Sequence, residues 1–139
     1  MSVPRLDPPV GLAVLRAVAR TIASGTALSV HDLSEGGLAV AAAEMAFAGG
    51  LGATLELGRI RGVPRSDVAL FSESPSRFLV EVNKADAERF EAVLGSVVFA
   101  QIGEVVAEPR LVVRGQRNDR VIDESIADLK EAWQRPLRW

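Results

Sequence analysis

The residues best suited to chemistry lie together in one short segment, His31-Asp32-Leu33-Ser34-Glu35-Gly36-Gly37-Leu38. A carboxylate, a hydroxyl and two adjacent glycines precede a long apolar run, so the segment predicts a strand that turns into a buried helix. Ser34 is predicted to cap that helix, because its oxygen can accept a hydrogen bond from the backbone N–H near Gly37. Asp32 lies two residues before the cap, where a carboxylate suits a hard cation such as Mg²⁺.

Gly36 and Gly37 make the same turn a candidate anion site. Their backbone N–H groups lie at the positive end of the helix dipole, and the missing side chains allow a phosphate to approach closely. The segment lacks the Gly-Lys-Ser/Thr ending of a P-loop and the glycine spacing of a dinucleotide-binding fingerprint. A packing explanation stays open, since a serine cap and two glycines also let a helix lie tightly against a sheet.

Two further polar features have both a structural and a functional explanation. His31 is the only histidine, and it is either a hydrogen-bonding group or a catalytic base that needs a matched partner and a bound substrate. A polar cluster either lines a domain interface or a substrate phosphate, or belongs to a Ser-Pro turn ahead of a strand. Its members are Ser72, Glu73, Ser74 and Arg77. We assign no catalytic residue from the sequence.

Composition limits the remaining classes. The 139 residues, of which 48% are hydrophobic, suit one packed domain, and a net charge of -2 argues against nucleic acid as a partner. The absence of cysteine excludes disulfides, a cysteine nucleophile and cysteine metal ligands. No apolar run is long enough to cross a membrane, and the first nine residues lack the apolar core of a signal peptide. We therefore expect a cytoplasmic protein.

The elements that must position these residues alternate early in the chain and become strand-rich later. Residues 1–9 contain three prolines and are predicted to be a linker or an artificial start, so that residues 10–139 form one domain. Periodicity and capping signals predict helices near residues 9–23, 38–48, 68–71, 83–95 and 125–134. Strands are predicted near residues 27–31, 53–57, 77–82, 97–106, 110–114 and 120–122.

This order predicts an α/β (α+β) domain in which a mixed sheet is covered by helices mainly on one face. The helix from Leu38 to Phe47 is expected to be buried nearly all round, because only Glu44 interrupts its apolar sequence. Trp133 and Trp139 are expected to pack the last helix or to cross an interface. The first helix is amphipathic, and one apolar stripe is expected to face the core. That stripe contains Leu12, Leu15, Ala19 and Ile22.

Three segments, in their order along the chain, resemble one family of enzymes. They are HDLSEGGLAVAAAEMAFAGGLGATLEL (His31–Leu57), LFSESPSRFLVEV (Leu70–Val82) and IGEVVAEPRLVV (Ile102–Val113). From about Leu12 to Leu137 the chain is similar to the C-terminal domain of the aminoimidazole ribonucleotide synthetase-like superfamily. Within it, the chain most resembles formylglycinamide ribonucleotide amidotransferase, also called phosphoribosylformylglycinamidine synthase. The resemblance implies the C-terminal-domain fold of that superfamily.

The resemblance also implies an activity and a site. The family enzyme is the ATP-dependent ligase of de novo purine biosynthesis that converts formylglycinamide ribonucleotide and glutamine-derived ammonia to formylglycinamidine ribonucleotide. Its full-length form uses Mg²⁺ and ATP or ADP. In the family, the aspartate of the His-Asp-x-Ser motif can ligate the Mg²⁺ of an auxiliary nucleotide, and the serine can contact that nucleotide. These roles map onto Asp32 and Ser34, with Gly36 and Gly37 as further nucleotide-binding residues.

The implied partners are the ATP-binding-type domains of the same synthetase, a separate glutaminase subunit and a small accessory subunit. Because the family places catalytic groups in those domains, the isolated chain is expected to be inactive, to hold no cofactor and to self-associate. Two alternatives stay open. One is a sister enzyme, such as aminoimidazole ribonucleotide synthetase, thiamine monophosphate kinase or a selenophosphate synthetase relative, although the segments Glu44–Gly50 and Phe71–Pro75 favour the amidotransferase. The other is a free-standing, non-catalytic binding or assembly module.

Overall fold

A computed structural model describes residues 5–137 of the protein. The helices are α1 (Pro8–Ala23), α2 (Gly37–Gly49), α3 (Ser66–Phe71), α4 (Ala87–Leu94) and α5 (Ile126–Gln134). The strands are β1 (Ala27–Asp32), β2 (Gly52–Glu56), β3 (Phe78–Val82), β4 (Gly103–Val106), β5 (Arg110–Arg114) and β6 (Arg120–Ser125). Short 3₁₀ helices occupy Leu57–Arg59, Lys84–Asp86 and Arg135–Leu137. None of the described helices is long and apolar enough to cross a membrane.

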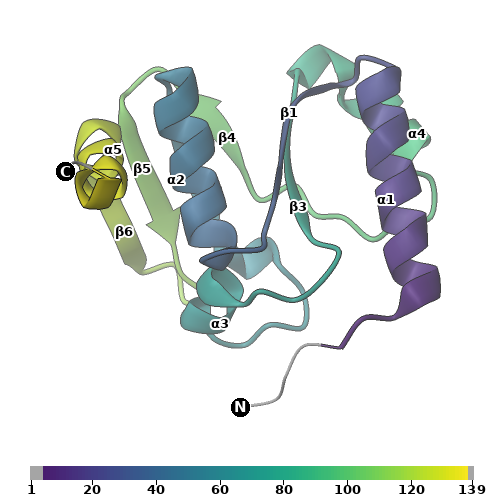
Figure 1. The fold of residues 1–139 in the computed structure, drawn as a ribbon, viewed down its shortest axis with the longest axis horizontal. Coiled ribbons are helices and arrows are strands. Elements are labelled where there is room, and N and C mark those ends of the chain that lie inside the picture. The colour runs from purple at the N-terminus through teal and green to yellow at the C-terminus, as the bar shows by residue number, and fades with distance from the viewer. Residues whose placement is uncertain (1–4, 138–139) are drawn as a thin grey trace.

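The strands form two separate sheets (Figure 1). Four of them are arranged in the order β4-β2-β5-β6, with β2 and β5 parallel and the other pairs antiparallel. This sheet confirms the prediction of a mixed sheet in an α/β domain. Strands β1 and β3 form an antiparallel pair of their own, in which Asp32 lies opposite Phe78.

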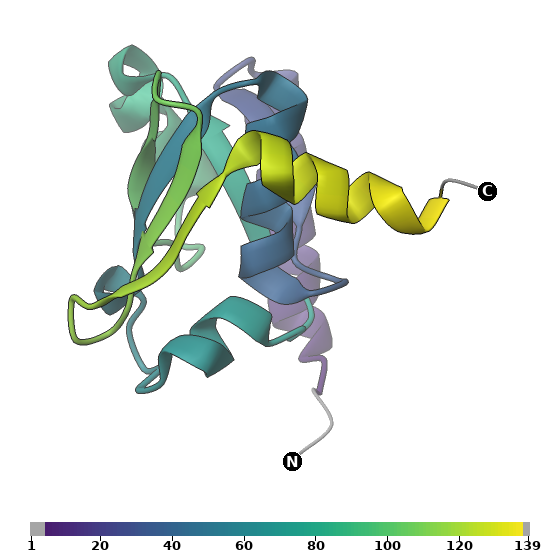
Figure 2. The same cartoon turned by 90° about the vertical axis from the view of Figure 1, so that its left-hand side faces the viewer.

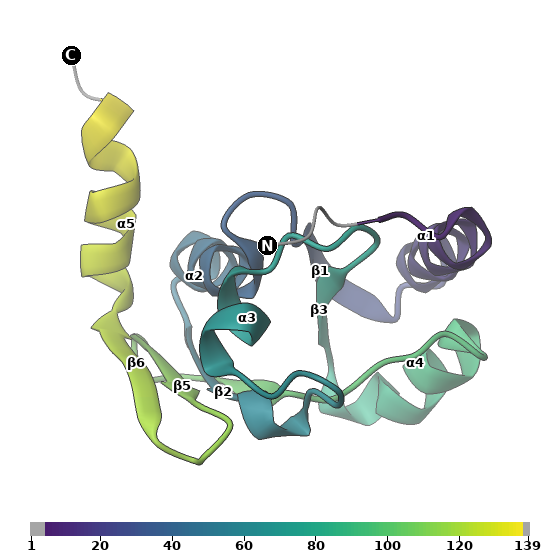
Figure 3. The ribbon, with the colours of Figure 1, turned by 90° about the horizontal axis from the view of Figure 1, so that it is seen from below.

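The layers place α2 at the centre of the molecule. It contacts β1 and β3 on one side and β2 and β5 on the other, while α1 and α4 lie together beyond the β1–β3 pair (Figures 1 and 3). Both faces of β3 are therefore covered, and all five of its residues are partly buried. For this reason the apolar and polar alternation that predicts β3 does not produce an exposed face.

Helix α2 is buried as the sequence predicts. Leu38, Ala41 and Ala42 are at most 3% exposed and belong to the main hydrophobic core with strands β2 and β5. The helix ends at Gly50, whose positive φ of 71° is favourable for glycine. Because α2 touches both sheets, it joins the two halves of the fold.

Helix α1 is oriented differently from the prediction. Its buried residues are small or β-branched: Gly11, Ala17, Val18 and Thr21. The predicted core stripe is wrong, because Leu12, Leu15 and Ile22 are 48%, 53% and 56% exposed and Ala19 is also exposed. Small side chains allow α1 to lie close to β1 and α4, and this close packing leaves the larger leucines on the outside.

Element bounds differ from the expected ones at three places. Helix α1 begins at Pro8, within the expected linker, because the Asp7 carboxylate accepts a hydrogen bond from the Val10 N–H at 3.1 Å; residues 1–4 lie outside the described residues. The strand expected over residues 97–106 is reduced to β4, the part that pairs with β2. Strand β6 extends to Ser125, and the Ser125 hydroxyl then caps α5.

Candidate functional site

The turn after β1 is fixed through its backbone and exposed through its side chains. The Leu33 N–H donates to the Arg77 carbonyl at 3.1 Å, and the Leu33 side chain is buried. Asp32 and Ser34 on either side are exposed. The Ser34 hydroxyl donates to the Asp32 carboxylate and thereby lowers the pKa of Asp32. An ionised carboxylate is thus presented to solvent at a well-defined point of the chain.

Ser34 does not cap α2, so that prediction is wrong. The N-cap is Gly36, and both Gly36 and Gly37 have positive φ, at 74° and 64°. This left-handed backbone delays the start of the helix beyond the reach of the Ser34 hydroxyl. The Gly36 N–H instead donates to a carboxylate oxygen of Glu73 at 2.8 Å.

Gly37 allows a close approach, but the group that approaches is the protein's own backbone. A Cβ at this position would lie 2.6 Å from the Leu70 carbonyl oxygen and 3.0 Å from the Ser72 carbonyl oxygen. The packing explanation therefore accounts for this glycine, which lies against the last residues of α3 and Ser72. The same contact brings the two polar motifs of the sequence, His31–Leu38 and Ser72–Arg77, side by side.

The second motif forms a turn held by its own hydrogen bonds. The hydroxyls of Ser72 and Ser74 are 2.9 Å apart, and the Arg77 guanidinium donates to the Ser72 carbonyl at 3.0 Å. Burial lowers the pKa of Arg77. These bonds support the turn explanation for Ser72, Ser74 and Arg77, whereas the Glu73 contact with Gly36 adds a link to the start of α2.

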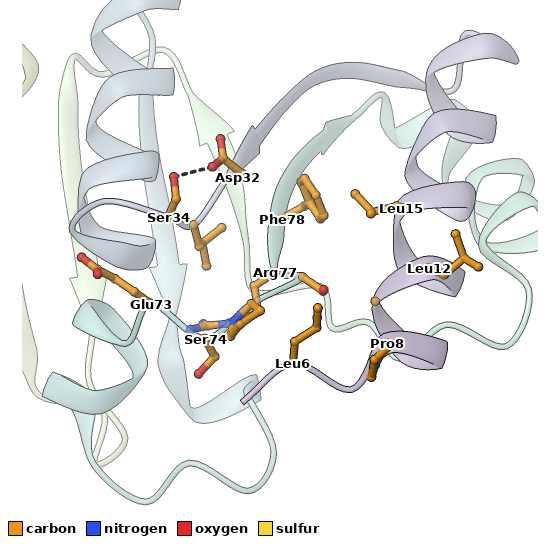
Figure 4. A pocket seen from close by; sticks show the side chains of 14 residues that line it. Leu6, Pro8, Leu12, Leu15, Asp32, Ser34, Glu73, Ser74, Arg77 and Phe78 are labelled. Atoms are coloured by element: carbon orange, nitrogen blue, oxygen red, sulfur yellow. Dashed lines mark hydrogen bonds between the residues drawn. The ribbon is translucent and has the colours of Figure 1, made fainter. Parts of the chain in front are cut away.

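A groove of about 590 Å³ separates this polar turn from α1 (Figure 4). Leu6, Leu12 and Leu15 lie on its α1 side, and Asp32, Ser34 and Glu73 lie on the opposite side. Phe78 and the Ser74–Arg77 segment also line it, together with Pro8, Gly11 and Leu33. The groove therefore combines an apolar wall with a wall that bears carboxylates and hydroxyls, an arrangement that suits an amphipathic ligand.

His31 is a hydrogen-bonding group, as one of its two explanations predicts. Nδ1 lies 2.6 Å from the Asp32 carbonyl oxygen and Nε2 lies 2.7 Å from a Glu44 carboxylate oxygen. Partial burial acts to lower the pKa of His31, but the hydrogen bonds to Asp32 and Glu44 outweigh burial and raise it above its ordinary value. Both neighbours are acceptors, so both ring nitrogens donate when the imidazole is protonated, the form that the raised pKa favours.

Trp133 packs the last helix against α2, as predicted. Its Nε1–H donates to Glu44 at 2.7 Å, and its ring lies 5.7 Å from the Phe47 ring. Trp139, which carried the same prediction, lies outside the described residues. Sequence reasoning missed Glu44 and Glu73 as partners of the His31–Leu38 segment. Glu44 could have been found from the sequence, because it is a lone carboxylate in an apolar helix. Glu73 could not, because its contact with Gly36 appears only in the folded structure.

The donor set suits Mg²⁺ only in part. Asp32 supplies the hard, ionised oxygen that Mg²⁺ prefers. Within residues 5–137, however, no group of three His, Cys, Asp or Glu residues is placed to hold a metal ion. Asp32 therefore fits the role of one ligand among several, with the remaining oxygens coming from a phosphate ligand, water or another domain.

Comparison with known proteins identifies a family and several similar proteins. The family model for the C-terminal domain of AIR synthase related protein matches residues 2–116. The chain is 35% identical over 136 residues to the phosphoribosylformylglycinamidine synthase subunit PurL of Deinococcus radiodurans, a match that covers 98% of this chain and 18% of that protein.

Solved structures of Thermotoga maritima PurL are also similar. The complex with FGAR has 28% identity and a TM-score of 0.78 and covers 92% of this chain and 22% of that one. The complex with ATP has 27% identity and a TM-score of 0.72 and covers 84% of this chain and 21% of that one. This protein thus spans 18–22% of the length of these relatives. Because the family match extends over most of its length, the chain belongs to the AIR synthase related proteins, as their C-terminal domain.

Proposed function

We propose that this chain is the C-terminal domain of a phosphoribosylformylglycinamidine synthase, the ATP-dependent ligase that converts formylglycinamide ribonucleotide to formylglycinamidine ribonucleotide in purine biosynthesis. The observation that carries the proposal is the alignment of 98% of the chain with a synthase subunit at 35% identity. Similar solved structures of that subunit are complexes with FGAR and with ATP, ADP or AMPPCP, which supports a role beside a nucleotide.

Within the proposed enzyme, Asp32 ligates a Mg²⁺ ion and Ser34 contacts the phosphates of a bound ATP or ADP. Mg²⁺ supplies the positive charge that allows a carboxylate and a phosphate to share one site. The exposed, ionised Asp32 beside the groove supports this role. The N-terminus of α2 favours an anion at Gly36 and Gly37, but the Gly36 N–H already donates to Glu73. A phosphate must therefore displace Glu73 or bind beside it.

The proposal includes partners and a cellular compartment. The remaining ligands for Mg²⁺ and the catalytic groups come from the ATP-binding-type domains of the same synthetase. Ammonia comes from a separate glutaminase subunit, assisted by a small accessory subunit, and the complete enzyme is cytoplasmic. The similar structure of PurLQS from Thermotoga maritima supports an assembly with further subunits.

The deciding experiment replaces Asp32 by Asn in the full-length synthetase and measures bound ADP and Mg²⁺ in the purified protein. Loss of both is expected, because the amide cannot neutralise the cation. Glu35→Gln is the matched control, since it removes a carboxylate from the same exposed turn and should leave the nucleotide bound. Stoichiometric ADP and Mg²⁺ in the Asp32→Asn protein would show that Asp32 is not a ligand.

The isolated chain provides a second test. Assayed with ATP and formylglycinamide ribonucleotide, it should release no phosphate above a heat-denatured sample, because the family's catalytic groups lie in other domains. Turnover that copurifies with the 139-residue chain would contradict the proposal and favour a self-contained enzyme.

A further inference from the structure

A continuous series of hydrogen bonds connects α5 to the turn at Asp32. The Trp133 Nε1–H donates to Oε1 of Glu44 at 2.7 Å, and the His31 Nε2–H donates to Oε2 of the same carboxylate at 2.7 Å. The His31 Nδ1–H donates to the Asp32 carbonyl at 2.6 Å. Figure 2 shows α5 crossing in front of α2, with which it is in contact. Strand β1 and helix α5 thus meet at one carboxylate of α2.

Glu44 is unusual for its position. It is the only charged residue of α2, and its side chain is only 25% exposed. Removing a carboxylate from water costs free energy unless it is hydrogen-bonded, and here each oxygen accepts from a different element. The other residues of α2 are apolar or glycine, so a charged side chain adds nothing to the apolar packing of the helix. The carboxylate is held in one orientation by the two donors.

The receiving end of the series is the peptide group after Asp32. His31 binds its carbonyl, and the N–H of the same peptide group, at Leu33, donates to the Arg77 carbonyl at 3.1 Å. Both polar groups of this peptide are therefore fixed, whereas the Asp32 side chain remains 57% exposed. A fixed backbone, with an exposed carboxylate that accepts from the Ser34 hydroxyl, is the arrangement expected for a ligand that is held ready for its cation.

We propose that Trp133 and Glu44 are positioning residues which, through His31, fix the direction of the Asp32 carboxylate towards the Mg²⁺ and nucleotide. This inference rests on the proposed function. We name the series Trp133–Glu44–His31 the α5 brace. Partners behind a metal ligand orient it and raise its affinity without touching the metal. Because Trp133 belongs to α5, the α5 brace makes the position of α5 one of the factors that set nucleotide affinity.

The test uses three variants of the full-length synthetase. Glu44→Gln removes the charge and one of the two acceptors, and Trp133→Phe removes the N–H donor while keeping an aromatic ring beside Phe47. Phe47→Leu is the matched control, since it disturbs the ring contact without changing any hydrogen bond of the α5 brace. In the presence of Mg²⁺, ADP should bind about tenfold more weakly to Glu44→Gln. Trp133→Phe should show a smaller loss, and Phe47→Leu should bind ADP unchanged.

A double variant separates positioning from general stability. If Glu44 acts through Asp32, then Glu44→Gln should cause no further loss of ADP affinity in the Asp32→Asn protein. Additive losses would overturn the inference. So would a normal affinity of Glu44→Gln when Asp32→Asn alone binds ADP weakly.

If Asp32→Asn binds ADP normally, the proposed site itself fails, and a separate measurement on the 139-residue chain then decides the α5 brace. Trp133→Phe should shift the backbone amide resonances of Leu33 and Ser34 more than Phe47→Leu does. Equal or absent shifts at these amides would overturn the inference.

Discussion

Helices α1 and α2 are both rich in apolar residues, yet they are packed in opposite ways. Helix α2 contacts both sheets, and all of its residues before Ala48 are buried or partly buried. Helix α1 buries small residues and presents Leu12, Leu15 and Ile22 to solvent at 48–56% exposure. A uniformly apolar helix can be buried only at the centre of the domain. An amphipathic helix with small residues on its other face can bury either face against the domain.

The exposed stripe of α1 borders the groove that contains Asp32. In a protein that spans 18–22% of its relatives' length, an apolar stripe beside a proposed shared site is consistent with a surface that another domain covers. The apolar stripe that the sequence pattern identifies is thus exposed in this domain.

The largest expected effect contrasts one leucine from each helix. Leu38→Ala in α2 should lower the free energy of unfolding by about 2–5 kcal/mol, because Leu38 is 2% exposed and its removal leaves a cavity. Leu12→Ala in α1 is the matched control and should change the value by less than about 0.5 kcal/mol. Urea unfolding measures both. Equal losses for the two variants would mean that the α1 stripe packs within the domain after all.

The same contrast explains how far the sequence could predict the structure. The order of helices and strands and the buried α2 were predictable, because local periodicity and capping determine them. The mixed sheet was predictable from that order, in which helices and strands alternate early and strands cluster late. The burial of Gly11 and Ala17 instead of Leu12 and Leu15 was not, because it depends on tertiary packing: Gly11 lies against Leu6 and Ser76, and α1 packs against α4 and β1. Gly36 and Gly37 both have positive φ, and this conformation removes Ser34 from the cap. Glycine adopts positive and negative φ about equally readily, so the sequence alone does not show which is present.

The second prediction compares two serines at the starts of helices. Ser125→Ala should lower the free energy of unfolding by about 1 kcal/mol, since the Ser125 hydroxyl accepts from the N–H groups of Ala127 and Asp128. Ser34→Ala should change it by less than about 0.5 kcal/mol, because Ser34 bonds to Asp32 and not to α2. Chemical denaturation of both variants is the measurement. A loss of similar size at Ser34 would restore its role as the cap of α2.

The third prediction concerns pH and the only charged residue of α2. The pKa of His31 is raised in the folded protein, against opposing burial, by hydrogen bonds to Asp32 and Glu44. Its contribution to stability is therefore fully present below the unfolded-state pKa of about 6.5 and is lost as the pH rises through the folded-state pKa. Thermal unfolding across this range should show that decline. In Glu44→Gln the decline should be weaker, and an unchanged pH profile in that variant would contradict the pairing.

The last prediction concerns substitutions in the α1 stripe, which should change the free energy of unfolding least but reduce self-association clearly. The isolated chain is expected to self-associate through the α1 stripe, since exposed apolar patches become contact sites when nothing covers them. Replacing Leu12 and Leu15 together by Ser should leave the free energy of unfolding nearly unchanged, yet reduce the apparent mass in light scattering at high concentration. Val98→Ser with Phe99→Ser is the matched control, because these residues are 97% and 48% exposed on a loop distant from α1 in sequence. If the control variant reduces the mass equally, or if the unmodified chain is already a monomer, the α1 stripe is not the surface through which the domain associates.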